Sequence, residues 1–228
     1  MNLAERYRSV LQTIEQTAQS VGRAKEDVEL IVVSKNHPAS LVAELVQLGQ
    51  EAFGENRDQE ASKKAEELKN SGFDVQWHFV GQLQSNKVKS VLEYASVIHS
   101  IDRPSLVAEL SKQLSKQNKK IDGFIELNLT YDLGRGGVAP QDLLTLAEQV
   151  LAVEQINLLG VMAVAGLGKD PAEEFERAIG LSQQLQTLAP TATKLSMGMS
   201  EDFEVAIRLG ATHIRVGSAI TGPRPISA

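Results

Sequence analysis

The chain alternates short apolar runs with segments of helical period along nearly its whole length. Eight apolar runs have the length of strands, and each ends in a polar or glycine-rich turn. They cover residues 28–33, 51–54, 76–80, 97–101, 123–129, 158–164, 193–197 and 212–216. Helical spacing separates them near residues 39–49, 56–70, 85–94, 103–118, 140–152, 171–188 and 201–209. Such alternation is typical of an α/β protein whose parallel sheet is covered by helices.

Eight strand and helix units can close into a single (β/α)8 barrel, the TIM barrel. That fold usually takes about 250 residues, so the 228 residues of this chain suffice if the loops are short. Leu3, Tyr7, Val10 and Ile14 recur at helical spacing, which predicts an additional N-terminal helix in place of a helix after the eighth strand. No linker divides the chain, so we expect one domain over residues 1–228. An open, doubly wound sheet is the alternative.

The amino-acid composition excludes several kinds of chemistry. The chain has no cysteine, so disulfides, thiolate zinc sites and a cysteine nucleophile are excluded, and no histidine motif predicts a metal. A formal net charge of −6 argues against a nucleic-acid binder, because neutralising phosphates requires a basic surface. No targeting segment or membrane-spanning apolar run is recognisable, so we expect a cytoplasmic protein without a membrane partner. A complete barrel with a polar exterior also favours a monomer.

Lys35 is the most informative single residue of the sequence. Reacting groups in barrels gather at the carboxyl ends of strands, and Lys35 closes the first apolar run. In the two-residue period of a strand it points the same way as Ile31 and Val33, into the barrel. Partial burial favours the uncharged amine, which is the form that condenses with an aldehyde. The alternative is that Lys35 caps the strand with its amine in solvent.

Two loops that follow the last two strands have the composition of an anion site. Residues 196–200 (SMGMS) precede an acid-rich segment, so we expect Ser200 to cap a helix whose free N–H groups face an anion. Gly217 and Ser218 follow the eighth strand and offer backbone donors and a hydroxyl. Barrels frequently hold phosphate in the loops after strands seven and eight, so residue type and position agree.

Arg215 lies inside the eighth run, in the same register as Gly217. It should therefore point into the barrel, where an unpaired guanidinium is very unfavourable. The sequence predicts either a buried acceptor or ligand for Arg215, or a structural ion pair with a carboxylate inside the barrel.

A glycine-rich stretch, residues 134–139 (GRGGVA), matches the dinucleotide-binding pattern in its letters. The pattern should begin directly at the end of a strand, whereas residues 130–133 intervene here. We expect this stretch to be a loop, with anion binding through Arg135 as its one candidate function.

Several short motifs carry a resemblance to a known family. They are SK at residues 34–35, FGEN at 53–56, WHFVG at 77–81, LQSNK at 83–87, GVMA at 160–163, LSMGMS at 195–200 and RVG at 215–217. In order and spacing they closely resemble the pyridoxal phosphate homeostasis protein family over residues 30–222. The resemblance implies a barrel similar to the N-terminal domain of alanine racemase and pyridoxal 5′-phosphate (PLP) as the cofactor. It also implies a carrier or regulator of PLP supply, since the family has no established catalytic activity.

The resemblance further implies roles for individual residues. Lys35 would form the internal aldimine with PLP, and Arg215 would face the pyridine nitrogen. Arginine is a permanent donor that cannot protonate this nitrogen, which discourages carbanion chemistry on the ring. The other implied contacts are Asn56 and His78 lining the pocket, Met162 near the ring, and Ser200, Gly217 and Ser218 at the phosphate.

The sequence departs from the family at three places where lysine is common. His37 follows Lys35, Arg135 occupies a loop position, and residues 223–228 contain no lysine. A second point of covalent attachment at these places is therefore in doubt, because the guanidinium of arginine stays protonated at neutral pH.

Three functions remain open on the sequence. The first is a non-catalytic protein that buffers PLP or delivers it to PLP-dependent apoenzymes. The alternative is a PLP-dependent amino-acid racemase, which needs a second acid/base group and for which Tyr131 is the candidate near the pocket. The third is an aldolase that uses Lys35 without a cofactor, with the paired loops holding a sugar phosphate. Because 228 residues leave no room for the second domain of a racemase, we expect the cofactor to be held without turnover.

Overall fold

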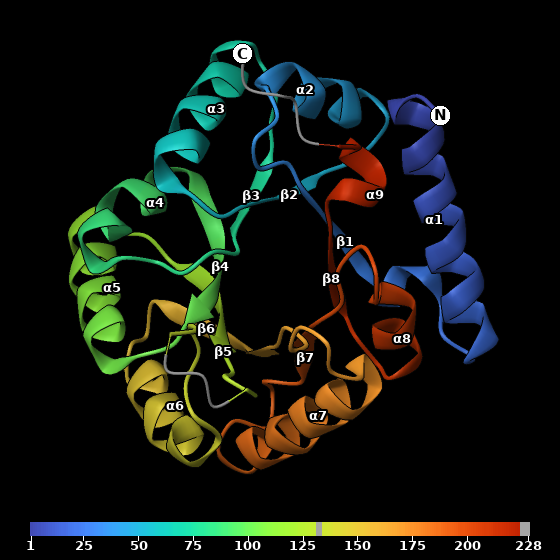
Figure 1. Ribbon diagram of the computed structural model, residues 1–228. Coiled ribbons are helices and arrows are strands. Elements are labelled where there is room, and N and C mark those ends of the chain that lie inside the picture. Colours follow the sequence, from blue (N-terminus) through green and yellow to red (C-terminus); the bar gives the residue numbers. More distant parts are fainter. Residues whose placement is uncertain (131–133, 224–228) are drawn as a thin grey trace.

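The eight strands form one closed, all-parallel barrel in the computed structural model, which describes residues 1–130 and 134–223 (Figure 1). The strands follow chain order around the barrel, and β1 pairs with β8 to close it. They are β1 (Glu29–Val33), β2 (Ala52–Glu55), β3 (Gln76–Phe79), β4 (Ala95–Ile101), β5 (Ile121–Glu126), β6 (Ile156–Met162), β7 (Lys194–Ser196) and β8 (His213–Val216). The predicted barrel is confirmed, and the open sheet is excluded.

Helices surround this barrel as a ring (Figure 1). They are α1 (Leu3–Ser20), α2 (Ala39–Gln47), α3 (Asp58–Asn70), α4 (Val88–Tyr94), α5 (Pro104–Gln117), α6 (Leu143–Leu151), α7 (Pro171–Leu188), α8 (Phe203–Arg208) and α9 (Ser218–Thr221), with 3-10 turns η1 (Lys25–Asp27), η2 (Ser85–Lys87) and η3 (Pro140–Asp142). Within the described part of the chain, none of these helices combines the length and the apolarity needed to cross a bilayer.

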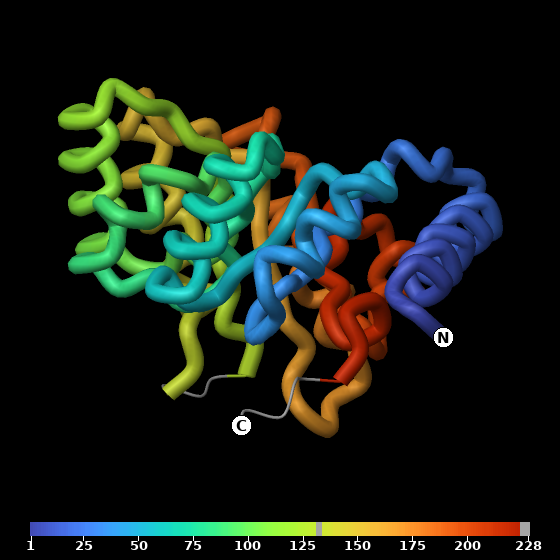
Figure 2. Tube along the Cα trace, turned by 90° about the horizontal axis from the view of Figure 1, so that it is seen from above, coloured from blue at the N-terminus to red at the C-terminus, as the bar shows by residue number. Residues whose placement is uncertain are grey.

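The additional N-terminal helix forms as predicted and lies outside the ring beside the end of the described chain (Figure 2). A capping box starts α1, in which the Asn2 side chain accepts from Glu5 N and the Glu5 carboxylate accepts from Asn2 N. The helix packs against α8 and α9, and Arg6 Nε donates to Ile220 O at 2.7 Å. Because the chain also forms α9 after the eighth strand, α1 supports that helix and does not replace it, which corrects the prediction.

The fifth strand ends earlier than its apolar run. β5 stops at Glu126, although the run continues to Leu129. Leu127 instead forms a single bridge with Val138 in the loop that follows. Backbone hydrogen bonds continue past the strand, from Leu127 N to Met162 O and from Asn128 N to Val138 O, so the apolar run outlasts the regular strand.

The barrel has two separate interiors. A continuous apolar core lies between the sheet and the helices and includes Phe53 and Phe175. The lumen holds a much smaller apolar cluster formed by Val97, Phe124 and Met162. Buried polar side chains also enter the lumen, namely His78, His99, Ser196 and Arg215. The outer core therefore holds the helices onto the sheet, whereas the lumen combines apolar packing with polar contacts.

Candidate ligand-binding site

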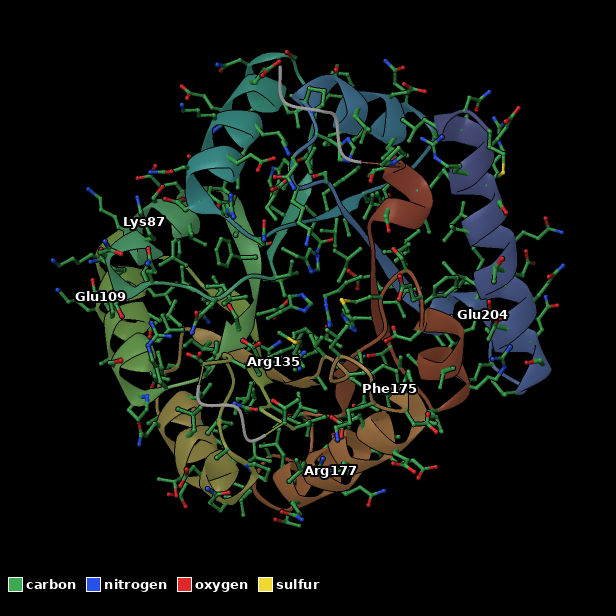
Figure 3. The ribbon with its side chains drawn as sticks, viewed as in Figure 1. Lys87, Glu109, Arg135, Phe175, Arg177 and Glu204 are labelled. Carbon is green, nitrogen blue, oxygen red and sulfur yellow. The ribbon has the colours of Figure 1, made fainter. Side chains whose placement is uncertain are left out.

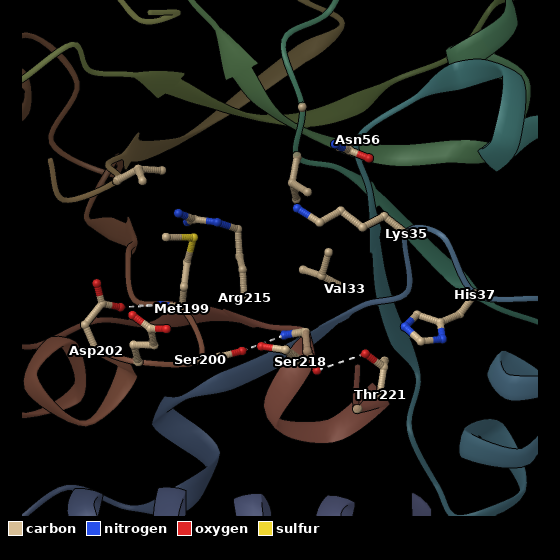
Figure 4. A pocket seen from close by; sticks show the side chains of 16 residues that line it. Val33, Lys35, His37, Asn56, Met199, Ser200, Asp202, Arg215, Ser218 and Thr221 are labelled. Carbon is tan, nitrogen blue, oxygen red and sulfur yellow. Dashed lines mark hydrogen bonds between the residues drawn. The ribbon is translucent and has the colours of Figure 1, made fainter. Parts of the chain in front are cut away.

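A cavity of about 490 Å³ opens at the carboxyl ends of the strands (Figure 4). It collects most of the residues that the sequence predicted for the pocket, namely Lys35, Asn56, Ser200, Arg215, Gly217 and Ser218. Val33 and Val164 add apolar surface to its wall. Strands β1 and β8 and the loop after β7 thus bring an amine, a guanidinium, hydroxyls and backbone donors to one place.

Lys35 extends from the end of β1 into this cavity (Figure 4). Val33, two residues earlier, also lines the cavity, as the two-residue period of the strand predicts. Lys35 is partly buried. The structure therefore favours the inward-pointing lysine over a lysine that caps the strand in solvent.

Lys64 of α3 holds the backbone immediately before Lys35. Its ammonium donates to Ser34 O at 2.9 Å and to Glu55 Oε1 at 2.5 Å, and the Ser34 hydroxyl donates to the same Glu55 oxygen at 2.7 Å. Lys64 is 5% exposed and Glu55 is fully buried, so each charge depends on the other. Burial raises the pKa of Glu55, while Lys64 and the Ser34 hydroxyl oppose that rise.

Glu60 of α3 holds the backbone immediately after Lys35. Asn36 has a left-handed conformation, with φ of 64°, and its N–H donates to Glu60 Oε1 at 2.5 Å. Lys64 Nζ contacts that same oxygen at 3.1 Å, so both flanks of Lys35 are tied to one helix. His37 follows in the cavity wall, and its pKa is lowered by burial and by the Lys64 charge. None of these α3 contacts was predicted from the sequence.

The two loops predicted to form an anion site do meet. Ser200 Oγ accepts from Gly217 N at 3.2 Å and from Ala219 N at 3.4 Å. Two backbone N–H groups at the start of α9, those of its N-cap Gly217 and of Ala219, therefore point at a single oxygen atom at the cavity wall. This arrangement joins the two loops through the residues that the sequence singled out.

Ser200 is not the helix cap that the sequence predicted. Helix α8 begins at Phe203 with Asp202 at its N-cap, and Asp202 Oδ1 accepts from Met199 N at 2.6 Å. The Asp202 carboxylate closes the turn in place of the serine, which leaves the Ser200 hydroxyl for the neighbouring loop. Gly198 permits this tight path, because it has φ of 97° and a Cβ there would lie 2.6 Å from a side chain of α8.

Arg215 enters the lumen from β8 and is 4% exposed. It donates through Nη1 to Ser196 Oγ at 2.6 Å and through Nη2 to Ala163 O at 2.9 Å. Both acceptors are neutral, and no carboxylate of the described residues lies within ion-pair distance of the guanidinium. Burial lowers the pKa of Arg215 to about 10, so the side chain is still charged at pH 7. Since Arg215 also lines the cavity, its remaining N–H groups are available to a ligand.

The chain is similar to known proteins over nearly its whole length. The family model for the alanine racemase N-terminal domain matches residues 10–225. The pyridoxal phosphate homeostasis protein of Aquifex aeolicus (strain VF5) is 38% identical over 98% of this chain and 99% of its own length. That of Escherichia coli (strain K12) is 34% identical over 99% of this chain and 98% of its own. The chain belongs to the pyridoxal phosphate homeostasis protein family.

Solved structures place this family member among proteins of the same architecture. PipY of Synechococcus elongatus PCC7942 is 36% identical and covers 97% of this chain, with TM-scores of 0.86 without PLP and 0.84 with PLP bound. Alanine racemase from Corynebacterium glutamicum is 17% identical, and its TM-score of 0.69 shows a shared fold. This chain covers 61% of the length of that racemase.

Two predicted pocket residues of this homeostasis-family chain lie deeper than expected. His78 and Met162 are not in the cavity wall; Val80 and Val164, two residues further along the chain and just past the ends of β3 and β6, line it instead. His78 Nδ1 lies 2.9 Å from His99 Nε2, deep in the lumen. The two-residue period identified the inward face of each strand correctly, but it does not say how far a residue lies from the barrel mouth.

Glu126 is a buried carboxyl that the sequence reasoning did not single out. Burial raises the pKa of Glu126 to about 7, the nearby Asp102 adds to the rise, and Arg215 and Arg135 oppose it. Glu126 Oε2 has no hydrogen-bond partner among the described residues. Its signal in the sequence is a charged residue two positions after Phe124, which is the same inward register.

The glycine-rich stretch is a loop, as predicted. Arg135 Nη2 donates to Ala165 O at 3.2 Å and to Val164 O at 3.4 Å, so the guanidinium ties two loops together. Anion binding through Arg135 remains a prediction. Tyr131, the candidate second base of a racemase, and the tail residues 224–228 lie outside the described residues.

Proposed function

We propose that this chain binds PLP reversibly at the mouth of the barrel, with Lys35 as the covalent attachment point and without catalytic turnover. The observation that carries this proposal is the convergence of Lys35, Arg215 and the joined loops at Ser200 and Gly217 on one cavity. Its support from relatives is that PipY, 36% identical to this chain, has a structure with PLP bound.

The cavity fits the chemical groups of PLP. Its volume of about 490 Å³ is within the range of small-ligand sites. The N–H groups of Gly217 and Ala219 already bind one oxygen atom, that of Ser200, so they are oriented as donors to oxygen. Ser218 adds a hydroxyl beside them, and Val33 offers apolar contact for a ring (Figure 4). We therefore assign the phosphate to these loops and the aldehyde to Lys35.

Each residue would contribute what its own chemistry allows. Glu60 and Lys64 fix the backbone on both sides of Lys35, which keeps its amine directed into the cavity. Arg215 donates hydrogen bonds and accepts none, so it would bind a ring nitrogen that carries no proton. Bound PLP would supply an aldehyde that condenses reversibly with primary amines. That reversibility suits a protein that stores and releases its ligand, since a competing amine can remove it.

Tyr7 and Tyr94, the two described tyrosines, are not candidates for the second base of a racemase. A racemase needs a second acid/base group opposite the lysine. Tyr7 donates to Gln50 Oε1 at 3.1 Å on the outside of the barrel, and Tyr94 packs edge-on against Trp77. Neither lines the cavity, so neither can act on a ligand attached to Lys35.

The first experiment compares Lys35→Ala with Lys63→Ala, which removes an exposed lysine of α3 as the matched control. We expect the unmodified protein and Lys63→Ala to retain PLP through gel filtration and to carry it on Lys35 after borohydride reduction, as read by peptide mass. Lys35→Ala should lose the covalent product. Attachment at another lysine would contradict the proposal, and racemisation of alanine or serine by the pure protein would contradict its non-catalytic part.

We also propose that the protein acts as a cytoplasmic monomer and passes PLP to PLP-dependent apoenzymes. The open cavity at the end of the barrel supports direct access by another amine. The loaded protein should reactivate an apoenzyme faster in one compartment than across a dialysis membrane. Equal rates in the two arrangements would show that the PLP travels through free solution.

A further inference from the structure

A line of polar side chains crosses the lumen from the cavity to the opposite end of the barrel. Arg215 Nη1 contacts Ser196 Oγ at 2.6 Å, and Ser196 Oγ lies 2.8 Å from His99 Nδ1. His99 Nε2 is 2.9 Å from His78 Nδ1, and His78 Nε2 is 3.4 Å from Glu29 Oε1. Glu29 is the first residue of β1, whereas Arg215 pairs with Ile31 in the middle of that strand and lines the cavity. The five side chains come from five different strands, β1, β3, β4, β7 and β8, so only the folded barrel brings them together.

The two ends of this line select one direction for its protons. Arg215 can only donate, so the Ser196 hydroxyl accepts from it and has its own proton to give to His99 Nδ1. His99 then carries its proton on Nε2 and donates to His78 Nδ1, which leaves the His78 proton on Nε2, facing the Glu29 carboxylate. The opposite assignment would leave the Ser196 proton without an acceptor in this line and would set a lone pair of His78 against a carboxylate. The donor at one end, Arg215, and the acceptor at the other, Glu29, thus both favour the tautomer of His99 and His78 that carries its proton on Nε2.

The last link depends on a pair of atoms with no other partner. His78 Nε2 and Glu29 Oε1 are both buried and form no hydrogen bond with any described residue, each other included. Their separation of 3.4 Å makes this last link an electrostatic contact, in which the ring nitrogen faces the carboxylate. The second oxygen of Glu29 lies 3.2 Å from His213 Nε2, which anchors the carboxylate at this end of the barrel.

The rings in the middle of the line are buried, and one of them is stacked on an aromatic side chain. Ser196 and His99 are fully buried and His78 is 1% exposed. His99 stacks on Phe124 with ring centroids 4.6 Å apart, which fixes its orientation. Burial lowers the pKa of His78 to about 4 and lowers that of His99 well below its ordinary value, so both rings are neutral at pH 7. Neutral rings can pass a hydrogen bond in one direction, as the line requires.

We propose that Ser196, His99 and His78 form a directed hydrogen-bond chain, with the Glu29 carboxylate in electrostatic contact at its far end, and that this chain fixes the Arg215 guanidinium at the cavity. In this hydrogen-bond chain both histidines are positioning residues: they hold the Arg215 guanidinium, which in turn helps to retain the ligand. The role in ligand retention rests on the proposed PLP binding, whereas the direction of the hydrogen bonds does not. In a low-dielectric interior each link polarises the next, so a change at one end is felt at the other.

The direction of the chain can be read in the full-length protein without any ligand. The sequence has four histidines, His37, His78, His99 and His213, so their ring nitrogens are few enough to assign by long-range proton–nitrogen NMR. We expect His78 and His99 to be neutral at pH 7 with the proton on Nε2. A proton on Nδ1 of either ring would overturn the proposal.

Two variants test whether the links communicate. Ser196→Ala should shift the ring nitrogens of both His99 and His78, whereas Ser182→Ala should shift neither, because Ser182 is an equally buried serine of α7 that accepts from Gln186. If Ser196→Ala destabilises the fold, a second variant changes the opposite end of the line at Glu29, whose side chain is partly exposed. Glu29→Gln should shift His78, and Glu51→Gln, an exposed carboxylate preceding β2, should not. If the ring nitrogens of His78 shift no more in Ser196→Ala and Glu29→Gln than in the control variants, the proposed hydrogen-bond chain is overturned.

Retention of PLP itself supplies the functional readout. In Ser196→Ala we expect PLP to dissociate roughly tenfold faster than in Ser182→Ala, the loss expected when a charged donor loses its buried acceptor. Glu29→Gln should accelerate release by roughly threefold from the far end of the barrel, since it weakens without removing the last link. If the unmodified protein does not hold PLP, the proposed function fails, whereas the NMR result still shows whether the hydrogen-bond chain has the proposed direction. If it holds PLP and Ser196→Ala releases it at the unmodified rate, the positioning role is overturned.

Discussion

The space between helices and sheet and the space inside the barrel are both tightly packed, but they are filled with different chemistry. The outer layer is a continuous apolar core that follows the helical and strand periods of the sequence. The lumen pairs a small cluster around Phe124 and Met162 with a line of polar groups that ends at Arg215. Residues of the outer layer can be exchanged for other apolar residues of similar volume, whereas each polar group in the lumen depends on specific partners. The outer layer thus supplies stability, and the lumen supplies geometry at the cavity.

Two phenylalanines provide the sharpest test of this contrast, because both are fully buried and only their location differs. Phe175 of α7 points into the outer layer (Figure 3), and Phe124 of β5 packs in the lumen against His99. Each substitution by alanine should lower the free energy of unfolding by about 3–5 kcal/mol, measured with urea. Among molecules that remain folded, Phe124→Ala alone should speed PLP release. Equal release rates in the two variants would remove the functional distinction between the two interiors.

The lumen carboxyl Glu126 should make stability depend on pH in an unusual direction. Its pKa is raised to about 7 by burial and then by Asp102, so the folded protein holds a proton that the unfolded chain loses near pH 4.5. Stability from this group is complete below pH 4.5 and is lost as the pH rises through 7. Relative to Glu126→Gln, the unmodified apoprotein should lose roughly 2 kcal/mol between these limits, measured by urea unfolding at several pH values. A pH-independent difference between the two proteins would contradict the assignment.

The outer surface should be the least sensitive part of the molecule. Glu204, on the rim of the barrel in Figure 3, pairs with Arg208 at 3.0 Å one turn later in α8, and both side chains are about half exposed. Arg208→Ala should change the free energy of unfolding by less than about 0.5 kcal/mol, because exposed ion pairs are screened by solvent. PLP release should be unchanged. A larger loss of stability would mean that the surface pair matters more than the described contacts imply.

Periodicity predicted the architecture well because it records which face of each element is buried. Alternating runs gave the closed barrel, and the two-residue register of β1 gave the inward direction of Lys35. The same reasoning placed Arg215 inside the barrel and joined the loops at Ser200 and Gly217. These features depend on local pattern and on the known arrangement of barrel strands, which the sequence contains.

Depth and partnership could not be predicted in the same way. His78 and Met162 face the lumen but lie one step below the cavity, because strand period carries no information on height. The Lys64–Glu55 pair behind Lys35 links a helix to a strand, and only the assembled fold brings the two together. Ser200 does not cap α8, because the helix begins two residues later than expected, with Asp202 at the N-cap position. In each case, the local sequence allows several arrangements, and only the assembled fold determines which residues become partners.

The contact of Arg6 with the last described helix ties ligand binding to the completion of folding. Its guanidinium holds the Ile220 carbonyl 214 positions further along the chain, in the short helix that begins with Ser218. A contact this distant in sequence carries a high entropic cost of loop closure, which other ordered parts of the fold must offset. A growing polypeptide therefore has no finished cavity until β8 has joined β1 and α9 has reached α1. The ability to hold PLP would then report that the whole barrel has closed, and local opening at this junction would free the ligand before the rest of the fold is lost.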